Sequence, residues 1–257
     1  MATTTSTDQQ GNPPRVAIVG GGPGGLLTAF FLQRAASRPI RTTLFEASRR
    51  LGGKVLTPSF AAAPVRYEAG AAEFYDYTPV GDDPLRALVA ELGLPTIPLG
   101  GAAVLVDGRA IGNMDDLERV LGTSARSAFE AFDARARGAM SPREFYASDE
   151  SMPVSGGTFS TAMDCIRNPA AYRYVEVMLH SDLATEAAQT SVSYGLQNYL
   201  MNDPAYMRLY GIAGGNERLV AALADRLDAT VRAGTRVVAV RGVDGGRFAL
   251  DTEPSTR

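Results

Sequence analysis

Three glycines between a buried strand and a helix constrain this fold more than any other feature of the sequence. Arg15–Gly20 (RVAIVG) is a short, β-branched run typical of buried parallel strands, and Pro23–Ser37 follows as a helix. The chain between them has the pattern G-x-G-x-x-G, at Gly20, Gly22 and Gly25. The first glycine allows a sharp turn, the second lets a pyrophosphate approach the backbone, and the third lets the helix pack tightly on the sheet. We therefore expect a dinucleotide-binding βαβ unit.

A carboxylate follows at the position where such a unit needs one. Arg41–Glu46 (RTTLFE) predicts the second strand, and Glu46 stands 21 residues after Gly25. A carboxylate there accepts hydrogen bonds from ribose hydroxyl groups and disfavours a 2′-phosphate. The start of the helix, with Pro23 and Gly24, presents unpaired N–H groups to phosphates. Without this context the glycines would also be compatible with a tight turn that binds no ligand.

The sequence returns to an α/β pattern after a long helical stretch. Val104–Ile111 predicts a hairpin, and residues 114–201 are mostly helical. Arg208–Ile212 then predicts a strand, Asn216 the N-cap of a helix, and residues 235–252 a second hairpin. A dinucleotide-binding domain that is interrupted by a substrate domain has this order of elements.

We therefore expect an α/β fold with an interrupted domain. The polar residues 1–14 predict a disordered lead-in. Residues 15–80 are expected to form the first part of the dinucleotide-binding domain, and residues 208–257 its second, incomplete part. Residues 81–207 are expected to form a mainly helical insert that serves as the substrate domain.

Composition and charge exclude several classes of function. The net charge of -3 and the pI near 5.3 argue against nucleic-acid binding. His180 is the only histidine and Cys165 the only cysteine, so we expect no metal site and no internal disulfide, and Cys165 reads as a small buried group. No signal peptide and no membrane span is recognisable. We expect a soluble, cytoplasmic protein.

The segment after the second strand resembles a known family. Residues 46–54 are Glu-Ala-Ser-Arg-Arg-Leu-Gly-Gly-Lys. They resemble the second signature of the flavin-containing amine oxidase superfamily, which includes monoamine, polyamine and L-amino-acid oxidases, protoporphyrinogen oxidase and related desaturases. The glycine pair would bring backbone near the diphosphate. Lys54 stands where the family usually has arginine and keeps a point charge without bidentate contact.

Later segments are similar to the same family. Tyr67–Ala72 (YEAGAA) resembles the segment that passes the flavin ring, Tyr210–Leu219 (YGIAGGNERL) resembles the return into the FAD domain, and Thr235–Val237 resembles the strand that contacts the adenine. The resemblance covers both ends of the chain, whereas the middle is similar to the family only in being mostly helical. It implies a Rossmann-like FAD-binding domain interrupted by a helical substrate domain. The cofactor-binding residues that it implies are Gly20, Gly22, Pro23, Gly24, Gly25, Glu46, Ala47, Arg50, Gly53, Lys54, Gly70, Ala71, Ala72, Glu73 and Val237.

The substrate is suggested by one departure from the family. L-Amino-acid oxidases have an arginine for the substrate carboxylate near the position that Glu73 occupies here. A carboxylate attracts a cation, so we expect an amine rather than a free amino acid, although Glu73 would also suit a structural hydrogen-bonding role. Tyr194 and Tyr199 could line an aromatic substrate pocket together with Tyr206 and Tyr210, or lie in the core.

The resemblance implies an FAD-dependent oxidoreductase. Such an enzyme oxidises the C–N bond of an amine or amino acid with dioxygen to an imine, which hydrolyses to a carbonyl compound and ammonia or an amine, with hydrogen peroxide as the second product. The sequence identifies no catalytic residue. A flavin desaturase or protoporphyrinogen-oxidase-like enzyme and a non-catalytic FAD-binding subunit are the alternatives.

The family's carboxyl-terminal segment has no counterpart before Arg257. We therefore expect one chain of a split or processed enzyme, a heteromer in which a second polypeptide supplies the carboxyl-terminal half. A truncated chain is the alternative.

Overall fold

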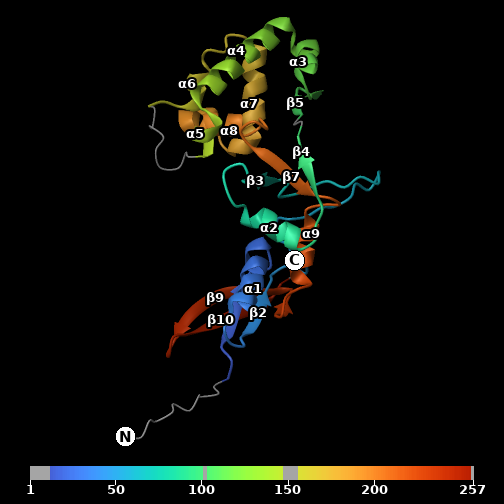
Figure 1. Ribbon diagram of the computed structural model, residues 1–257, viewed down its shortest axis with the longest axis vertical. Coiled ribbons are helices and arrows are strands. Elements are labelled where there is room, and N and C mark those ends of the chain that lie inside the picture. The colour runs from blue at the N-terminus through green and yellow to red at the C-terminus, as the bar shows by residue number, and fades with distance from the viewer. Residues whose placement is uncertain (1–11, 101–102, 147–155, 256–257) are drawn as a thin grey trace. The chain divides into compact units, whose positions relative to one another are not determined.

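The computed structural model describes residues 12–100, 103–146 and 156–255 (Figure 1). The chain forms two compact units. The first unit comprises Met1–Phe74, Pro84–Ile97 and Gly211–Arg257, as far as these are described. The second unit comprises Tyr75–Asp83 and Pro98–Tyr210. Of the predicted lead-in at residues 1–14, residues 1–11 lie outside the described part.

The first unit contains the predicted βαβ arrangement. Strands β1 (Arg15–Val19) and β2 (Arg41–Phe45) pair in parallel, and helix α1 (Pro23–Ala35) connects them. Strand β8 (Thr230–Arg232) pairs in parallel with the other edge of β2, which gives the order β1-β2-β8. The sequence does not predict β8, because three residues with no buried side chain give no periodic signal.

A compact apolar core lies under this sheet. Helix α1 packs on β1 and on helix α9 (Glu217–Ala224), and Leu26 and Leu223 are fully buried between these elements. Helix α2 (Pro84–Glu91) adds Leu88 and Val89 to the same cluster. Residues 84–97 therefore belong to the first unit, whereas the sequence predicts a single insert over residues 81–207.

The remaining strands form three small sheets. Strands β9 (Thr235–Val243) and β10 (Arg247–Pro254) form an antiparallel ribbon with a register shift after Asp251. Strands β5 (Val104–Val106) and β6 (Arg109–Ile111) form the predicted hairpin. The third sheet has the order β3-β7-β4, from strands β3 (Phe74–Asp76), β7 (Arg208–Ile212) and β4 (Thr96–Leu99).

The described part of the second unit is mainly helical. Its helices are α3 (Met114–Leu121), α4 (Thr123–Ala139), α5 (Pro142–Tyr146), α6 (Phe159–Met163), α7 (Pro169–Leu183), the 3₁₀-helix η1 (Ala187–Gln189) and α8 (Val192–Leu200). Side-chain oxygens cap three of them: Asn113 caps α3, Asn168 caps α7 and Ser191 caps α8.

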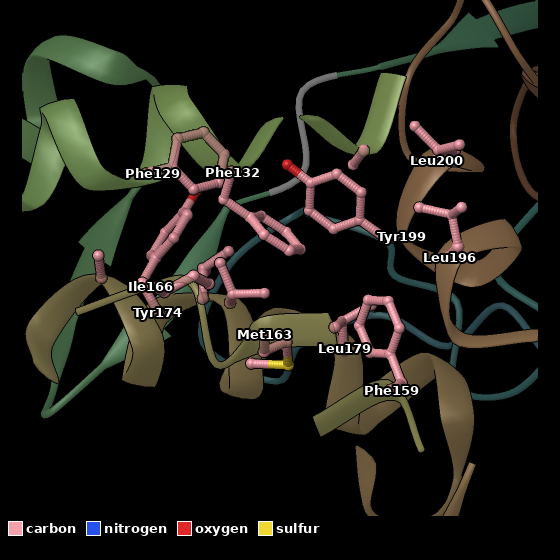
Figure 2. Packing of buried hydrophobic residues seen from close by; sticks show 14 of the residues in the cluster. Phe129, Phe132, Phe159, Met163, Ile166, Tyr174, Leu179, Leu196, Tyr199 and Leu200 are labelled. Atoms are coloured by element: carbon pink, nitrogen blue, oxygen red, sulfur yellow. The ribbon is translucent and has the colours of Figure 1, made fainter. Parts of the chain in front are cut away.

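Aromatic rings dominate the core of this unit. Figure 2 shows Phe132 of α4 beside Tyr199 of α8, with ring centroids 5.0 Å apart in an edge-to-face arrangement. Phe159 of α6 is fully buried, and α8 approaches it at Gly195. A Cβ at that position would overlap the Phe159 ring, so the close packing of α6 and α8 requires glycine there.

Two expectations from the sequence need correction. Asn216 stands at the predicted N-cap position of α9, but its side chain makes no capping hydrogen bond, because its Oδ1 accepts from the Ile212 N–H instead. Cys165 is exposed rather than buried, in a short turn after α6. Among the helices that the structure describes, none is both long and apolar enough to cross a membrane.

Candidate functional site

A glycine turn joins β1 to α1 in the first unit. Gly20 has a φ of +103°, which disfavours residues with a side chain, and its N–H donates to the Phe45 carbonyl at 2.8 Å. A Cβ on Gly25 would overlap the Gly20 carbonyl oxygen. The turn therefore requires Gly20 and the close helix packing requires Gly25, two of the three glycines of the sequence motif.

A second glycine loop lies against the first. The Gly52 N–H donates to the Gly21 carbonyl at 2.8 Å, and a Cβ on Gly53 would come within 3.1 Å of the Gly22 Cα. A Cβ on Gly24, in contrast, would meet no atom within 4 Å. The start of α1 thus has free space beside it and backbone on its other side. Helix N–H groups that face free space suit an anionic diphosphate.

Glu46 lies at the end of β2 beside this cradle. Its Oε2 accepts from the Gly21 N–H and its Oε1 from the Ser48 N–H, both at 2.7 Å. Burial raises the pKa of Glu46, but these hydrogen bonds and the charge of Arg50 outweigh it, so the pKa lies below its usual value of 4.5. The carboxylate is ionised near neutral pH and has further acceptor capacity for hydroxyl groups.

The remaining residues of the second signature have different environments. The Arg50 guanidinium donates to the carbonyls of Leu51 and Gly53, at 3.2 and 2.5 Å, and so supports the glycine loop. Ala47 is half-buried and Lys54 is exposed. Arg50 therefore holds the loop through its carbonyls, a contact that the sequence does not reveal.

The carboxyl-terminal part of the unit returns to the same loop. The Glu46 N–H donates to the Arg232 carbonyl at 3.0 Å, and the Thr235 N–H donates to the Glu46 carbonyl at 2.9 Å. Val237 is half-buried on β9, two residues further on. The structure therefore brings Glu46 and the strand of Val237 together, although they are far apart in the sequence.

Asn216 holds the backbone of Tyr67–Ala72, the segment that resembles the part of the family that passes the flavin ring. Its side chain is buried, with a relative exposure of 1%, and its Nδ2 donates to the carbonyls of Ala71 and Ala72, both at 3.1 Å. The Asn216 N–H donates to Glu68 at 2.9 Å. The sequence analysis missed these roles of Asn216 and Glu68, because only the tertiary fold brings them together.

The same segment also runs close to the second glycine loop. The Ala71 N–H donates to the Lys54 carbonyl at 2.9 Å, and a Cβ on Gly70 would overlap that carbonyl oxygen. Glu73 follows and is exposed. The predicted cofactor residues of the amino-terminal part thus lie in loops that contact one another through backbone groups.

The second unit contains a cavity of about 500 Å³. One face of α8 lines this cavity, through Tyr194, Gln197, Asn198 and, just after the helix, Met201. These residues recur at spacings of three and four, as expected for one face of a helix. The opposite face of α8 contributes Leu196, Tyr199 and Leu200 to the apolar core (Figure 2). The cavity is lined by Tyr75, Tyr77, Phe145, Tyr146, Asp182, Tyr194, Gln197, Asn198, Met201 and Met207.

The two tyrosines expected at a substrate pocket have separate environments. Tyr194 is 53% exposed and lines the cavity. Tyr199 is buried, and its hydroxyl donates to Asp133 Oδ1 at 2.8 Å. Burial and the nearby Asp133 charge raise the pKa of Tyr199 well above its usual range. Tyr206 is likewise a core residue that donates to the Met140 carbonyl, so of the tyrosines named from the sequence only Tyr194 lines this cavity.

The sequence as a whole matches a protein family. The family model "Flavin containing amine oxidoreductase" matches residues 23–256. Nicotine dehydrogenase of Pseudomonas putida is 26% identical over 256 residues, which cover 94% of this chain and 50% of that protein. Coproporphyrinogen III oxidase of Mycobacterium tuberculosis is 38% identical over 82 residues, 32% of this chain and 17% of that protein.

Solved structures show the same fold. A variant of putrescine oxidase has a TM-score of 0.65 at 17% identity, over 96% of this chain and 57% of that one. A protoporphyrinogen oxidase-like protein from Exiguobacterium sp. 255-15 has a TM-score of 0.60 at 19% identity, over 94% of this chain and 57% of that one. The chain therefore has an α/β FAD-binding fold, and it spans about half the length of nicotine dehydrogenase and of these two structures.

Proposed function

This chain belongs to the flavin-containing amine oxidoreductases, and we propose from this premise that it oxidises the C–N bond of an amine with dioxygen as electron acceptor. Membership of the family implies FAD as the cofactor. The substrate, the electron acceptor and the products are our proposal, since the chain spans only part of the length of its relatives.

The observation that carries the proposal is the pair of glycine loops around the start of α1. A Cβ at Gly24 would meet no atom within 4 Å, so the start of α1 borders free space that suits the FAD diphosphate, while the Gly52–Gly53 loop supports the turn from the other side. The ionised Glu46 suits the ribose hydroxyl groups.

The chemistry that FAD supplies when bound is the two-electron oxidation of a C–N bond, with the electrons passing on to dioxygen. In the overall reaction an amine, dioxygen and water give a carbonyl compound, ammonia or a smaller amine, and hydrogen peroxide. The protein's part is to hold the cofactor and to orient the substrate. Glu73 is exposed and negatively charged, which favours a cationic amine over an amino acid with its carboxylate.

The proposal is tested by oxygen consumption and peroxide release with a panel of amines and L-amino acids. We expect turnover of amines, and we expect Glu73→Gln to raise KM for amines about threefold while it leaves the bound flavin unchanged. Strong preference for free amino acids would contradict the charge argument. Bound flavin that no amine reduces would contradict the proposed reaction itself.

A second candidate is oxidation of a porphyrinogen or a related desaturation. It is favoured by the 38% identity to coproporphyrinogen III oxidase and by the structural likeness to a protoporphyrinogen oxidase-like protein. The two candidates differ in substrate and share the same flavin chemistry. Peroxide release with coproporphyrinogen III or protoporphyrinogen but with no amine would select the second candidate.

Three expectations from the sequence stay predictions. They are the second polypeptide, the cytoplasmic location and the role of the helical unit as the substrate domain. Mass spectrometry of every polypeptide in the purified sample tests the first, and a sample with only this chain, active and loaded with flavin, would contradict it.

A further inference from the structure

We propose that the cavity of the second unit binds an organic ammonium ion with an apolar body, and that Asp182 selects for its positive charge. This inference names the substrate class of the proposed amine oxidation and rests on that proposal. Four properties of the cavity support it: its size, its walls, its charge and an unpartnered acceptor.

Size and wall chemistry both suit a small organic molecule. A volume of about 500 Å³ lies within the range of known small-molecule sites, roughly 300–1,000 Å³. The walls combine the rings of Tyr75, Tyr77, Tyr146 and Tyr194 with apolar groups at Phe145 and the methionines. Tyr77 and Tyr146 meet edge to face at 6.3 Å, which fixes two of these rings relative to each other.

Aromatic walls of this kind favour cations. The face of a tyrosine ring carries partial negative charge and attracts ammonium groups. Tyr77 and Tyr194 are about half exposed, so their rings are accessible at the opening, whereas Phe145 is buried. A ligand with an ammonium group near the tyrosines and an apolar body over Phe145 would use both kinds of wall.

The charge of the residues that line the cavity also favours a cation. Asp182 is the one charged residue among the described residues that line the cavity. It is exposed, and its Oδ2 accepts a hydrogen bond from Asn202 Nδ2 at 3.2 Å, which leaves it further acceptor capacity. Burial raises the pKa of Tyr146 most, and the nearby negative charge of Asp76 raises it further, whereas Arg208 lowers it. The Asp182 carboxylate adds negative charge at the lining itself.

A buried acceptor in the wall lacks a partner. Asn198 has a relative exposure of 8%, and its Oδ1 has no hydrogen-bond partner within the described part of the chain. Gln197 beside it donates to the Phe145 carbonyl at 3.1 Å, so the neighbouring amide is held in place. A bound N–H donor would satisfy the Asn198 acceptor after a small side-chain adjustment.

The experiment compares two probes of similar size on the purified protein by isothermal titration calorimetry. Benzyltrimethylammonium carries a fixed positive charge on a nitrogen without a lone pair, so it cannot be oxidised to an iminium ion and reports binding alone. N-Benzyl-N-methylacetamide is its neutral counterpart and likewise has no N–H bond. We expect the cation to bind at least about fivefold more tightly than the amide, as an ion pair together with cation–π contact predicts.

Variants assign the preference to its residues. Asp182→Asn should weaken binding of the cation about threefold to fivefold and leave the amide unchanged. Glu176→Gln on the same helix removes the same charge outside the cavity and should change neither affinity. Tyr194→Leu should weaken binding of the cation more than Tyr194→Phe does, since phenylalanine keeps the aromatic ring. Circular dichroism melting curves check that each variant folds.

The outcomes separate this inference from the proposed function. Equal affinity of the wild type for both probes, no binding of the cation, or equal effects of Asp182→Asn and Glu176→Gln would overturn the inference. Amine oxidation that benzyltrimethylammonium does not inhibit, with a KM that Asp182→Asn leaves unchanged, would overturn it while the function stands. Charge-selective binding without oxidation of any amine would support the cavity and contradict the function.

Discussion

The two units build their candidate sites from different parts of the chain. In the first unit the cradle consists of backbone: N–H groups and carbonyls of two glycine loops approach each other where side chains are missing. In the second unit the cavity consists of side chains, with four tyrosines, two amides and one carboxylate along its wall. A backbone site tolerates few substitutions at its glycines, whereas a side-chain site can change specificity one residue at a time.

This difference predicts how each unit responds to substitution. Changes at the cradle should affect stability and flavin content together, because the same backbone supports the fold and, in our proposal, binds the cofactor. Changes in the second unit should separate the two properties.

The largest effect is expected for Gly25→Ala. The added Cβ would overlap the Gly20 carbonyl oxygen, which is backbone and cannot rotate away. We expect a loss of about 3 kcal/mol or more in the free energy of unfolding, together with loss of bound flavin. Urea unfolding and the visible spectrum measure both. Gly138→Ala, at an open position of α4, is the control and should be neutral or slightly stabilising. Normal flavin content in Gly25→Ala would contradict the expected coupling of stability and flavin binding in the first unit.

Asn216→Leu is expected to have the next largest effect. It would leave the carbonyls of Ala71 and Ala72 and the Ile212 N–H without their partner in a buried place. We expect about 2–3 kcal/mol of destabilisation and a changed or absent flavin spectrum. Asn216→Asp keeps the acceptor for Ile212 but turns a carboxylate oxygen towards the Ala71 and Ala72 carbonyls, so it should be destabilised as well. If Asn216→Leu matched the wild type in stability and spectrum, Asn216 would have no positioning role.

Gly195→Ala tests the second unit in the same way. Its Cβ would overlap the side chain of Phe159, which can shift only within a packed core. We expect about 1–3 kcal/mol of destabilisation. The flavin content should stay normal, in contrast to Gly25→Ala. A parallel loss of flavin in Gly195→Ala would show that the two units do not respond separately.

Tyr199→Phe removes one hydroxyl group from the core of the second unit. That hydroxyl donates to Asp133 at 2.8 Å, so we expect about 1 kcal/mol of destabilisation. The amine KM should not change, because Tyr199 does not line the cavity. The exposed Tyr194→Phe is the matched variant and should leave stability unchanged. A raised KM in Tyr199→Phe alone would restore Tyr199 as a substrate residue.

The smallest effect concerns pH. The pKa of Glu46 lies below 4.5 in the folded protein, so its contribution to stability is present above that pH and is lost as the pH falls through the lowered value. Glu46→Gln should therefore be less stable than the wild type near neutral pH. The difference should shrink as the pH falls below 4.5. Urea unfolding at several pH values measures it, and a pH-independent difference would contradict the stated cause.

These contrasts also explain what the sequence could predict. Gly20, Gly25 and Glu46 were recognisable because a strand, a turn and a helix within a few tens of residues require them locally. The strands β1, β2 and β7 and the helix α1 followed from the same local patterns. The Arg50 contacts, the Asn216 hydrogen bonds and strand β8 could not be predicted, since each depends on segments that only the tertiary fold brings together.

The cavity was still harder to anticipate. Tyr194 and Tyr199 are both aromatic residues of α8, and composition does not tell which one faces the core. The helical spacing distinguishes them: Tyr194 shares its face with Gln197 and Asn198, and Tyr199 shares its face with Leu196 and Leu200. Asp182 gave no local signal, because a single exposed carboxylate on a helix is usually only solvated.

The visible absorption spectrum of the purified protein, with every polypeptide in the sample identified, tests the central claim most directly. We predict a flavin spectrum, with FAD released on denaturation, and its loss in Gly25→Ala but not in Gly195→Ala. A folded wild-type protein that shows no flavin spectrum, even after incubation with FAD, would contradict the assignment of the cradle.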